Sequence, residues 1–305
     1  MRVAAIDCFR GLSIVLMVFF TMLLALSSNI PDFITHNLPN SIHIGDFVLP
    51  MFLFASGMSI VFFREKHIKK GRLEYVLDII ERAGKLAIIW LFLSPFSAAG
   101  FMGFDELILG IILFLAVIII AEFPEKAIVL GVAVPIIFYL ILHYMGGLPD
   151  FSAHYIGGYA STIFYLPIML AGFIAAKTQN RGPVILGSLA VGLILSFFIP
   201  PYKLIASPSF MMLAVFFSLL IFELIERFKI RNSHLEYLGK KPLRYWILMY
   251  VVIIIPVLYY AYYSGIGLPL GFAWEEAVVI NIGLIGFLYL LSKVVDRIPI
   301  ISKVM

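Results

Sequence analysis

The sequence predicts an all-α, polytopic integral membrane protein with about ten transmembrane helices and both termini in the cytoplasm. Three observations predict this fold class. Hydrophobic residues make up 62% of the 305 residues, charged residues only 13%, and the mean hydropathy is +1.05, whereas a soluble domain carries about 25% charged residues. Apolar runs long enough to cross a bilayer recur along the chain, and Lys and Arg are distributed unevenly between them. We interpret residues 1–305 as a single transmembrane domain.

The predicted helices follow from the lengths of the apolar runs. A helix needs about 20 predominantly apolar residues to cross the hydrocarbon core of a bilayer. The third and fourth runs form a short hairpin around Pro95 and the acidic pair at 105–106. Many further runs follow the first one, so we expect it to stay in the membrane and not to be a cleaved signal peptide. The predicted spans are residues 11–28, 46–63, 85–103, 106–122, 127–145, 161–177, 183–199, 209–226, 245–263 and 275–292.

The basic residues predict the orientation of these spans. Cytoplasmic loops of membrane proteins are enriched in Lys and Arg. With the N-terminus inside, Lys203 is the only basic residue placed outside, and the other 21 of the 22 lie inside. Topology therefore explains the net charge of +4 and the pI near 9.0. We expect the lipid bilayer as a partner and no nucleic acid.

Asp7 and Arg10 stand at the inner end of the first predicted span. Residues three apart are neighbours on one face of a helix, so these side chains can pair at the membrane boundary. Such a pair, together with anchoring of the orientation, explains both residues. In the alternative interpretation, Arg10 binds a phosphate or carboxylate that arrives from the cytoplasm. Cys8 is the only cysteine, which excludes a disulfide within the chain, and we expect it to be buried.

The loop before the second span and the start of that span hold residues suited to acid–base chemistry. Asp46 stands at the head of the predicted helix, where a carboxylate caps backbone N–H groups and is favoured by the helix dipole. An acidic residue at membrane depth is also a candidate functional residue. The spacing of the histidines predicted near the outer face is unlike that of usual zinc ligands, so we expect no metal there. The histidines predicted on or near the outer face are His36, His43, His143 and His154.

The first span and this second stretch together resemble the catalytic region of the heparan-α-glucosaminide N-acetyltransferase family of transmembrane acyltransferases. The similarity lies in Ile-Asp-x-Phe-Arg-Gly-Leu at residues 6–12 and in Gly-Asp-Phe-Val-Leu-Pro-Met-Phe-Leu-Phe at residues 45–54, and it covers roughly residues 2–85. In this family the active-site histidine precedes the Asp of the second motif by ten residues, as His36 precedes Asp46. The resemblance therefore implies that His36 is catalytic, with Asn40 and Asp46 at matching positions.

We expect His43, Asp32 and Ser41 to contact the substrate beside these catalytic residues. The chain departs from the family pattern at Thr21, where the family commonly has Asn. It departs again at residues 238–245, which are similar to a late Leu-Gly-x-Asn-x-Leu-x-x-Tyr pattern but lack its Asn and the histidine that usually follows.

A cluster of basic residues follows the second predicted span on the cytoplasmic side. Positive-inside topology and contact with anionic lipid headgroups explain such a cluster without any ligand. For an acyl-CoA donor, the same side chains offer partners for the phosphates. The residues that we predict to bind the donor are Arg10, Arg64, Lys66, Lys69, Lys70, Arg72, Arg82 and Lys85.

The resemblance implies an enzyme that moves an acetyl or other acyl group from cytoplasmic acetyl-CoA to an amino sugar or other glycan acceptor at the outer face of a prokaryotic cell membrane. Acyl transfer needs a base for the nucleophile and donors for the developing oxyanion. His36 suits the first task, and Asn40 or Ser41 the second. We allow for a homodimer. A ten-helix solute transporter built from two repeats stays open as an alternative, although the two halves share no motif. A scaffold without chemistry would leave the outer His and Asp residues unexplained.

Overall fold

The computed structural model describes residues 4–34, 41–68, 71–97, 105–147, 161–265 and 268–298. These parts of the chain are helical, apart from loops and one isolated parallel bridge between Ser27 and Phe272. The all-α prediction is therefore confirmed for them. Several predicted site residues lie outside the described residues. They are His36, Asn40, Lys69, Lys70 and His154.

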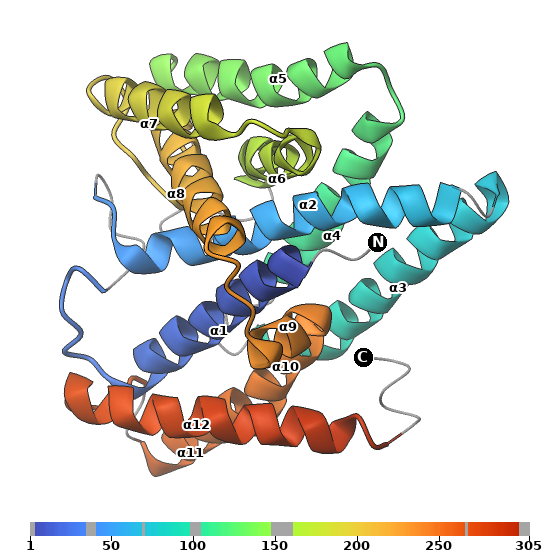
Figure 1. Cartoon of the computed structure of the whole chain (residues 1–305). Helices are drawn as coiled ribbons and strands as arrows, with labels where there is room; N and C mark the ends of the chain where they lie inside the picture. The colour runs from blue at the N-terminus through green and yellow to red at the C-terminus, as the bar shows by residue number, and fades with distance from the viewer. Residues whose placement is uncertain are drawn as a thin grey trace. The chain divides into compact units, whose positions relative to one another are not determined.

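A helix lies at each of the predicted spans (Figure 1). A short 3-10 helix, η1 (Ile44–Phe47), leads into α2, and α10, η4 and α11 follow one another without a break. The longer helices are α1 (Ala4–Leu26), α2 (Val48–Ile68), α3 (Arg72–Ser97), α4 (Asp105–Ala121), α5 (Glu125–Tyr144), α6 (Thr162–Lys177), α7 (Gly182–Ser196), α8 (Pro208–Arg227) and α12 (Trp274–Val295). The shorter ones are α9 (Ser233–Lys240), α10 (Pro242–Met249), η4 (Tyr250–Ile254), which is a π-helix, and α11 (Ile255–Ser264).

Six helical segments in the described parts of the chain are long and apolar enough to cross a membrane. Helices α6, α7 and the Leu107–Ala121 part of α4 are apolar but shorter. A multi-pass membrane protein is thus supported, whereas the count of about ten spans and the cytoplasmic termini stay predictions. The six segments are Ala4–Leu26, Ile44–His67, Glu125–Tyr144, Pro208–Arg227, Pro242–Ser264 and Trp274–Val295.

Two helices differ from the sequence-based expectation. Helix α3 begins at Arg72, well before residue 85, so Arg72, Arg82 and Lys85 lie on its first four turns. Helix α9 was not predicted as a separate element. It begins after Asn232, whose side-chain Oδ1 accepts hydrogen bonds from the backbone N–H groups of His234 (2.9 Å) and Leu235 (3.1 Å). This N-cap is the local reason for the helix.

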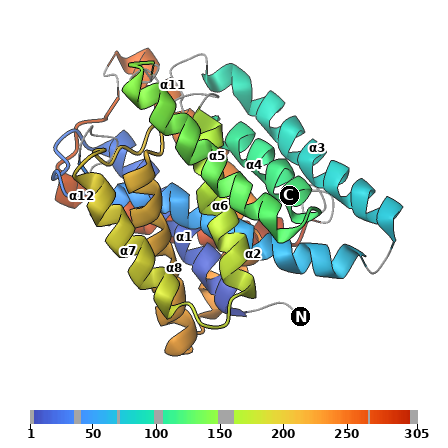
Figure 2. The ribbon, with the colours of Figure 1, turned by 90° about the horizontal axis from the view of Figure 1, so that it is seen from above.

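The chain divides into two compact units, which we describe separately. Unit 1 comprises Pro50–Glu223 together with residues 41–42. In it, α4, α5 and α6 pack against one another and α3 packs against α4 (Figure 2). Helices α2 and α6 meet without side chains between them, because Gly57 lies against the carbonyl of Met169 and Gly172 against that of Phe54. Small residues allow such close helix contacts in membranes.

Unit 2 comprises residues 4–34, His43–Leu49 and residues 224–298. Helix α1 packs against α9, α10 and α12 in this unit, and α10 packs against α12. A Cβ on Gly11 would lie 1.9 Å from the carbonyl oxygen of Leu235, and one on Gly239 would lie 1.7 Å from that of Asp7. The backbones of α1 and α9 therefore touch, and only glycine fits at either position. Cys8 is fully buried in this unit, as expected.

Candidate functional site

Asp46 and His43 form a buried pair just before α2, at the end of unit 2 where α1 finishes. The carboxylate of Asp46, which is 1% exposed, accepts a hydrogen bond of 2.9 Å from the backbone N–H of His43. The backbone N–H of Asp46 donates in return to the carbonyl of His43 at 3.0 Å. This reciprocal arrangement starts the helix, so the predicted place of Asp46 at a helix start is confirmed.

The same carboxylate also faces the ring of His43. Asp46 Oδ2 lies 3.6 Å from His43 Nδ1, and the His43 side chain is only 10% exposed. This distance is within the range of an ion pair but too long for a hydrogen bond, and His43 Nδ1 has no hydrogen-bond partner among the described residues. The backbone N–H of Ile44 donates to the carbonyl of Phe33 at 3.3 Å, which ties this turn to the segment that follows α1. The pair therefore lies on a turn whose backbone is held by hydrogen bonds.

The other residues predicted for this site do not belong to the pair of Asp46 and His43. Asp32 is exposed in unit 2, and Ser41 is half-buried in unit 1. His36 and Asn40, for which a catalytic role is predicted, lie outside the described residues. The structure thus brings together Asp46 and His43, and the approach of His36 to this pair stays a prediction.

Arg10 is held at the opposite end of α1. Its Nη2 donates to Asp7 Oδ1 at 2.9 Å, which confirms the predicted ion pair, and its Nε donates to the carbonyl of Gly239. Asp7 is 3% exposed. Gly239 is in the last turn of α9, where backbone carbonyls lack helical partners, so Arg10 caps that helix. These contacts account for Arg10 structurally, and its predicted role in donor binding stays a prediction.

The predicted donor-binding residues of unit 1 lie on α2 and α3. We call Arg64, Lys66, Arg72, Arg82 and Lys85 the hairpin cluster. Arg64 Nε donates to Glu122 at 2.8 Å, and the hydroxyl of Tyr75 donates to the same carboxylate at 3.3 Å. The hydrogen bond from Arg64 lowers the pKa of Glu122. Burial, followed by the charge of Glu122, raises the pKa of Tyr75 to about 12.

The remaining members of the hairpin cluster have different surroundings. The guanidinium of Arg82 lies 4.2 Å from the ring centroid of Phe63, and the neighbouring His67 pairs with Asp78. Lys85 pairs with Glu81 at 2.6 Å, one turn away on α3. In the hairpin cluster, Arg64 and Lys85 therefore each have an acidic partner of their own, and Lys66 and Arg72 are exposed.

The described residues contain no group of three or more His, Cys, Asp or Glu side chains that could hold a metal ion. Of the outer histidines that the sequence singled out, His43 lies beside Asp46 in unit 2, and His143 stacks on Tyr139 in unit 1 with ring centroids 6.0 Å apart. His36 and His154 are not among the residues described.

One polar cluster in unit 2 was missed by sequence reasoning. It joins the ends of α9, α10 and α12 around Asp296. The available signal was the pair of adjacent lysines at 240–241 before Pro242, together with an acidic residue directly after the last apolar run. Nothing in the sequence placed these two segments side by side.

The segment from α1 to α6, which carries Arg10, His43, Asp46 and the hairpin cluster, matches a known family. The family model described as "Heparan-alpha-glucosaminide N-acetyltransferase, catalytic" matches residues 2–182, which is more than half of the chain. No curated protein shows a significant match to the chain. The family implies a membrane-bound N-acetyltransferase and agrees with acetyl-CoA as co-substrate and an amino sugar as acceptor. The chain belongs to the heparan-α-glucosaminide N-acetyltransferase family.

Proposed function

We propose that the protein transfers an acetyl or other acyl group from cytoplasmic acyl-CoA to an amino sugar or another glycan acceptor at the outer face of the membrane. The observation that carries this proposal is the buried Asp46 beside His43, inside the segment that matches the family's catalytic region. A carboxylate held next to a histidine is suited to proton transfer. The alternative of a solute transporter has no comparable support.

The chemistry joins the acceptor to the acyl carbon of the thioester. An amine attacks this carbon, a base removes one proton from the amine, and the C–S bond breaks as coenzyme A leaves and takes up a proton. We assign the base to His36 and the stabilisation of the oxyanion to Asn40 or Ser41. Direct transfer and a transient acyl-histidine both fit this balance. Packed helices around the site would exclude water and protect the thioester.

Asp46 and His43 would support the reaction from their fixed positions. In our proposal Asp46 is part of the catalytic group, because its carboxylate holds the turn that precedes α2 and faces an imidazole. His43, together with Asp32 and Ser41, would bind the acceptor. Hydroxyl and amino groups of a sugar need a few well-placed hydrogen-bonding partners, which these side chains provide.

The donor would bind with its charged end on basic residues of the cytoplasmic side and extend its acyl arm toward the outer end. The stretch of α1 from Arg10 to Leu26 is about 24 Å long at 1.5 Å per residue. This length is what the arm of the donor would have to bridge if it follows α1. The acyl group would then cross the bilayer while the phosphates stay on the cytoplasmic side.

Turnover of acetyl-CoA by the purified full-length protein tests this proposal. Free thiol would be measured across a panel of amino sugars and lipid-linked sugars, and we expect release that depends on one class of acceptor. The variant His36→Ala should lose this release and keep its thermal stability. His143→Ala is the matched control, because His143 is also predicted at the outer face but stacks on Tyr139 in α5. Full turnover by His36→Ala would contradict the assignment of His36.

A further inference from the structure

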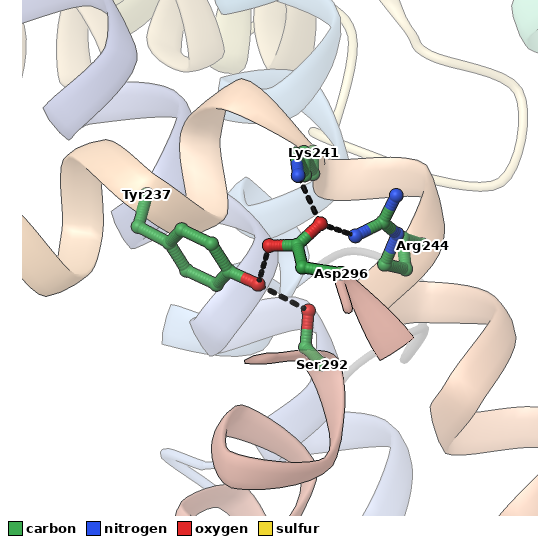
Figure 3. Close-up of polar contacts among 5 residues, drawn as sticks. All are labelled: Tyr237, Lys241, Arg244, Ser292 and Asp296. Carbon is green, nitrogen blue, oxygen red and sulfur yellow. Dashed lines mark hydrogen bonds and ion pairs between the residues drawn. The ribbon is translucent and has the colours of Figure 1, made fainter. Parts of the chain in front are cut away.

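A single carboxylate in unit 2 binds two cations. Asp296, which directly follows α12, accepts hydrogen bonds from Lys241 Nζ and from Arg244 Nη1 on the same oxygen. The hydroxyl of Tyr237 donates to its other oxygen at 2.6 Å and lies 3.1 Å from Ser292 Oγ. Figure 3 shows these five side chains converging from α9, α10 and the end of α12. The carboxylate thus holds the three segments together.

A third cationic side chain, Lys293, lies near the ring of Tyr237. Lys293 Nζ is 4.7 Å from the ring centroid of Tyr289 and 5.8 Å from that of Tyr237. Lys241 Nζ is 5.7 Å from the centroid of Tyr237. Among the residues that the structure describes, no carboxylate pairs with Lys293, whose side chain is exposed. We call Tyr237, Lys241, Arg244, Lys293 and Asp296 the C-terminal cluster.

The C-terminal cluster has more positive than negative charge in a partly buried place. Arg244 is 0% exposed. A buried guanidinium is costly unless it is paired, so Arg244 depends on Asp296. Three cations around one carboxylate repel one another, and an anion that binds between them would relieve this repulsion. The other acidic residues on α9, α10 and α12 are Glu236, in the first turn of α9, and Glu275 and Glu276, in the first turn of α12 and so at its opposite end. The electrostatics therefore favour an anionic ligand.

The position of the C-terminal cluster relative to the predicted membrane spans indicates which anions can reach it. It lies at the start of the span Pro242–Ser264 and at the end of the span Trp274–Val295. Consecutive spans that run in opposite directions place these two ends at the same face of a membrane. The positive-inside rule predicts that this face is cytoplasmic. Phosphate groups of lipids and of nucleotides are the abundant anions at such a surface.

We propose that Lys241 and Lys293, supported by the charge of the buried Arg244, bind a phosphate-bearing group, at a site that lies beyond the family-matched residues 2–182. Lysine serves as a point charge for phosphate oxygens. Two sources share this chemistry: the nucleotide end of the acyl donor, a choice that rests on the proposed function, and the headgroup of an anionic lipid.

Equilibrium binding to the full-length protein tests the site without any turnover. The probes are adenosine 3′,5′-bisphosphate in neutral detergent, and nanodiscs of phosphatidylglycerol compared with phosphatidylcholine, all at matched ionic strength. We expect at least one probe to raise the thermal midpoint. Lys293→Gln should weaken that binding about tenfold, which corresponds to one charge-assisted hydrogen bond. Lys126→Gln is the matched control, because Lys126 is an exposed lysine of α5 in unit 1.

The source of the phosphate follows from which probe responds. Stabilisation by the nucleotide supports the donor as the ligand, and stabilisation by phosphatidylglycerol alone supports a lipid headgroup. No stabilisation by either probe, or an equal response of Lys293→Gln and the wild-type protein, would overturn the proposal. These outcomes are separate from the failure of the proposed function, which would show as an absence of acceptor-dependent thiol release.

Asp296→Asn tests the proposal in the opposite direction, because it should strengthen the binding of the probe. This variant removes the carboxylate that competes with an external anion, so it should be less stable than the wild-type protein in buffer without phosphate. We expect the responding probe to bind it more tightly and to produce a larger rise of its thermal midpoint. A purely structural role for Asp296 predicts the loss of stability without this rescue. If the variant does not fold, Lys293→Gln still decides the question.

Discussion

The two basic clusters of this protein differ in how their charges are matched. In and beside the hairpin cluster, three pairs are one to one: Arg64 with Glu122, His67 with Asp78 and Lys85 with Glu81. In the C-terminal cluster, two cations share Asp296 and a third has no acidic partner in the described chain. The sequence drew attention to the first cluster because its charges are dense. The second has fewer charges and a larger local excess of positive charge.

Burial separates the arginine of one cluster from that of the other as well. The side chains of Arg64 and Glu122 are 29% and 44% exposed, whereas the Arg244 side chain is 1% exposed. Exposed pairs are screened by water and contribute little to stability. Buried charges interact strongly and are costly when one partner is missing. A dense row of charges in a sequence is therefore a weaker sign of a binding site than an unbalanced group at the ends of packed helices.

The largest effect on stability is expected at the contact between α1 and α9, because α9 carries Tyr237 of the C-terminal cluster. Gly239→Ala places a Cβ 1.7 Å from the carbonyl oxygen of Asp7, so the two helices must separate. We expect a loss of about 3 kcal/mol or failure to fold. Gly84→Ala on α3 of the hairpin cluster is the control, because nothing lies within 4 Å of its Cβ. It should stabilise the protein by about 0.5 kcal/mol. Equal unfolding midpoints of the two variants would contradict the close helix contact.

The next test compares one arginine from each cluster. Arg244→Gln removes a fully buried cation and should lower the free energy of unfolding by about 3 kcal/mol. Arg64→Gln breaks a partly exposed pair with Glu122 and should cost less than about 1 kcal/mol. Thermal or denaturant unfolding in the same detergent measures both. A larger effect at Arg64 would show that exposure does not decide the difference between the clusters.

These two clusters also show how far the sequence could predict the structure. Apolar run lengths located the helices, and a three-residue spacing predicted the pair of Asp7 and Arg10, because both depend on local geometry. The place of Asp46 at a helix start was predictable for the same reason. The contact between Asp296 and Lys241 joins residues 55 positions apart, and it depends on packing that no local pattern encodes. Arg10 needed the structure too, since its partner Gly239 is on a helix that the sequence did not reveal.

The dependence of stability on pH should also differ between the clusters. Burial alone would raise the pKa of Asp296, but hydrogen bonds from Lys241, Tyr237 and Arg244 outweigh it and lower the pKa to about 2. A carboxylate with a lowered pKa stabilises the folded state above its ordinary pKa, and this contribution is lost as the pH falls from about 4 through about 2. We expect a loss of about 1 kcal/mol after screening by solvent.

Denaturation midpoints measured between about pH 6 and pH 2 would show this loss in the wild-type protein. The Asp296→Asn variant should give a flatter profile over the same range, since it has no proton to take up. Glu122→Gln is the comparison from the hairpin cluster, where Arg64 also lowers the pKa of the carboxyl. Its profile should differ less from wild type, because the Glu122 side chain is 44% exposed. Parallel profiles for the wild-type protein and Asp296→Asn would contradict the expected effect.

The smallest effect on stability is expected for Lys85→Gln, and this variant separates the two clusters most directly by function. Lys85 and Glu81 form an exposed pair one turn apart, which is worth about 0.4 kcal/mol. If the hairpin cluster binds the donor as the sequence predicts, Lys85→Gln should raise the KM for acetyl-CoA several-fold and leave kcat unchanged. If the C-terminal cluster holds the phosphates alone, only Lys293→Gln should do so. Steady-state kinetics of both variants, with Lys126→Gln as control, therefore assign the phosphates to one cluster, to the other or to both.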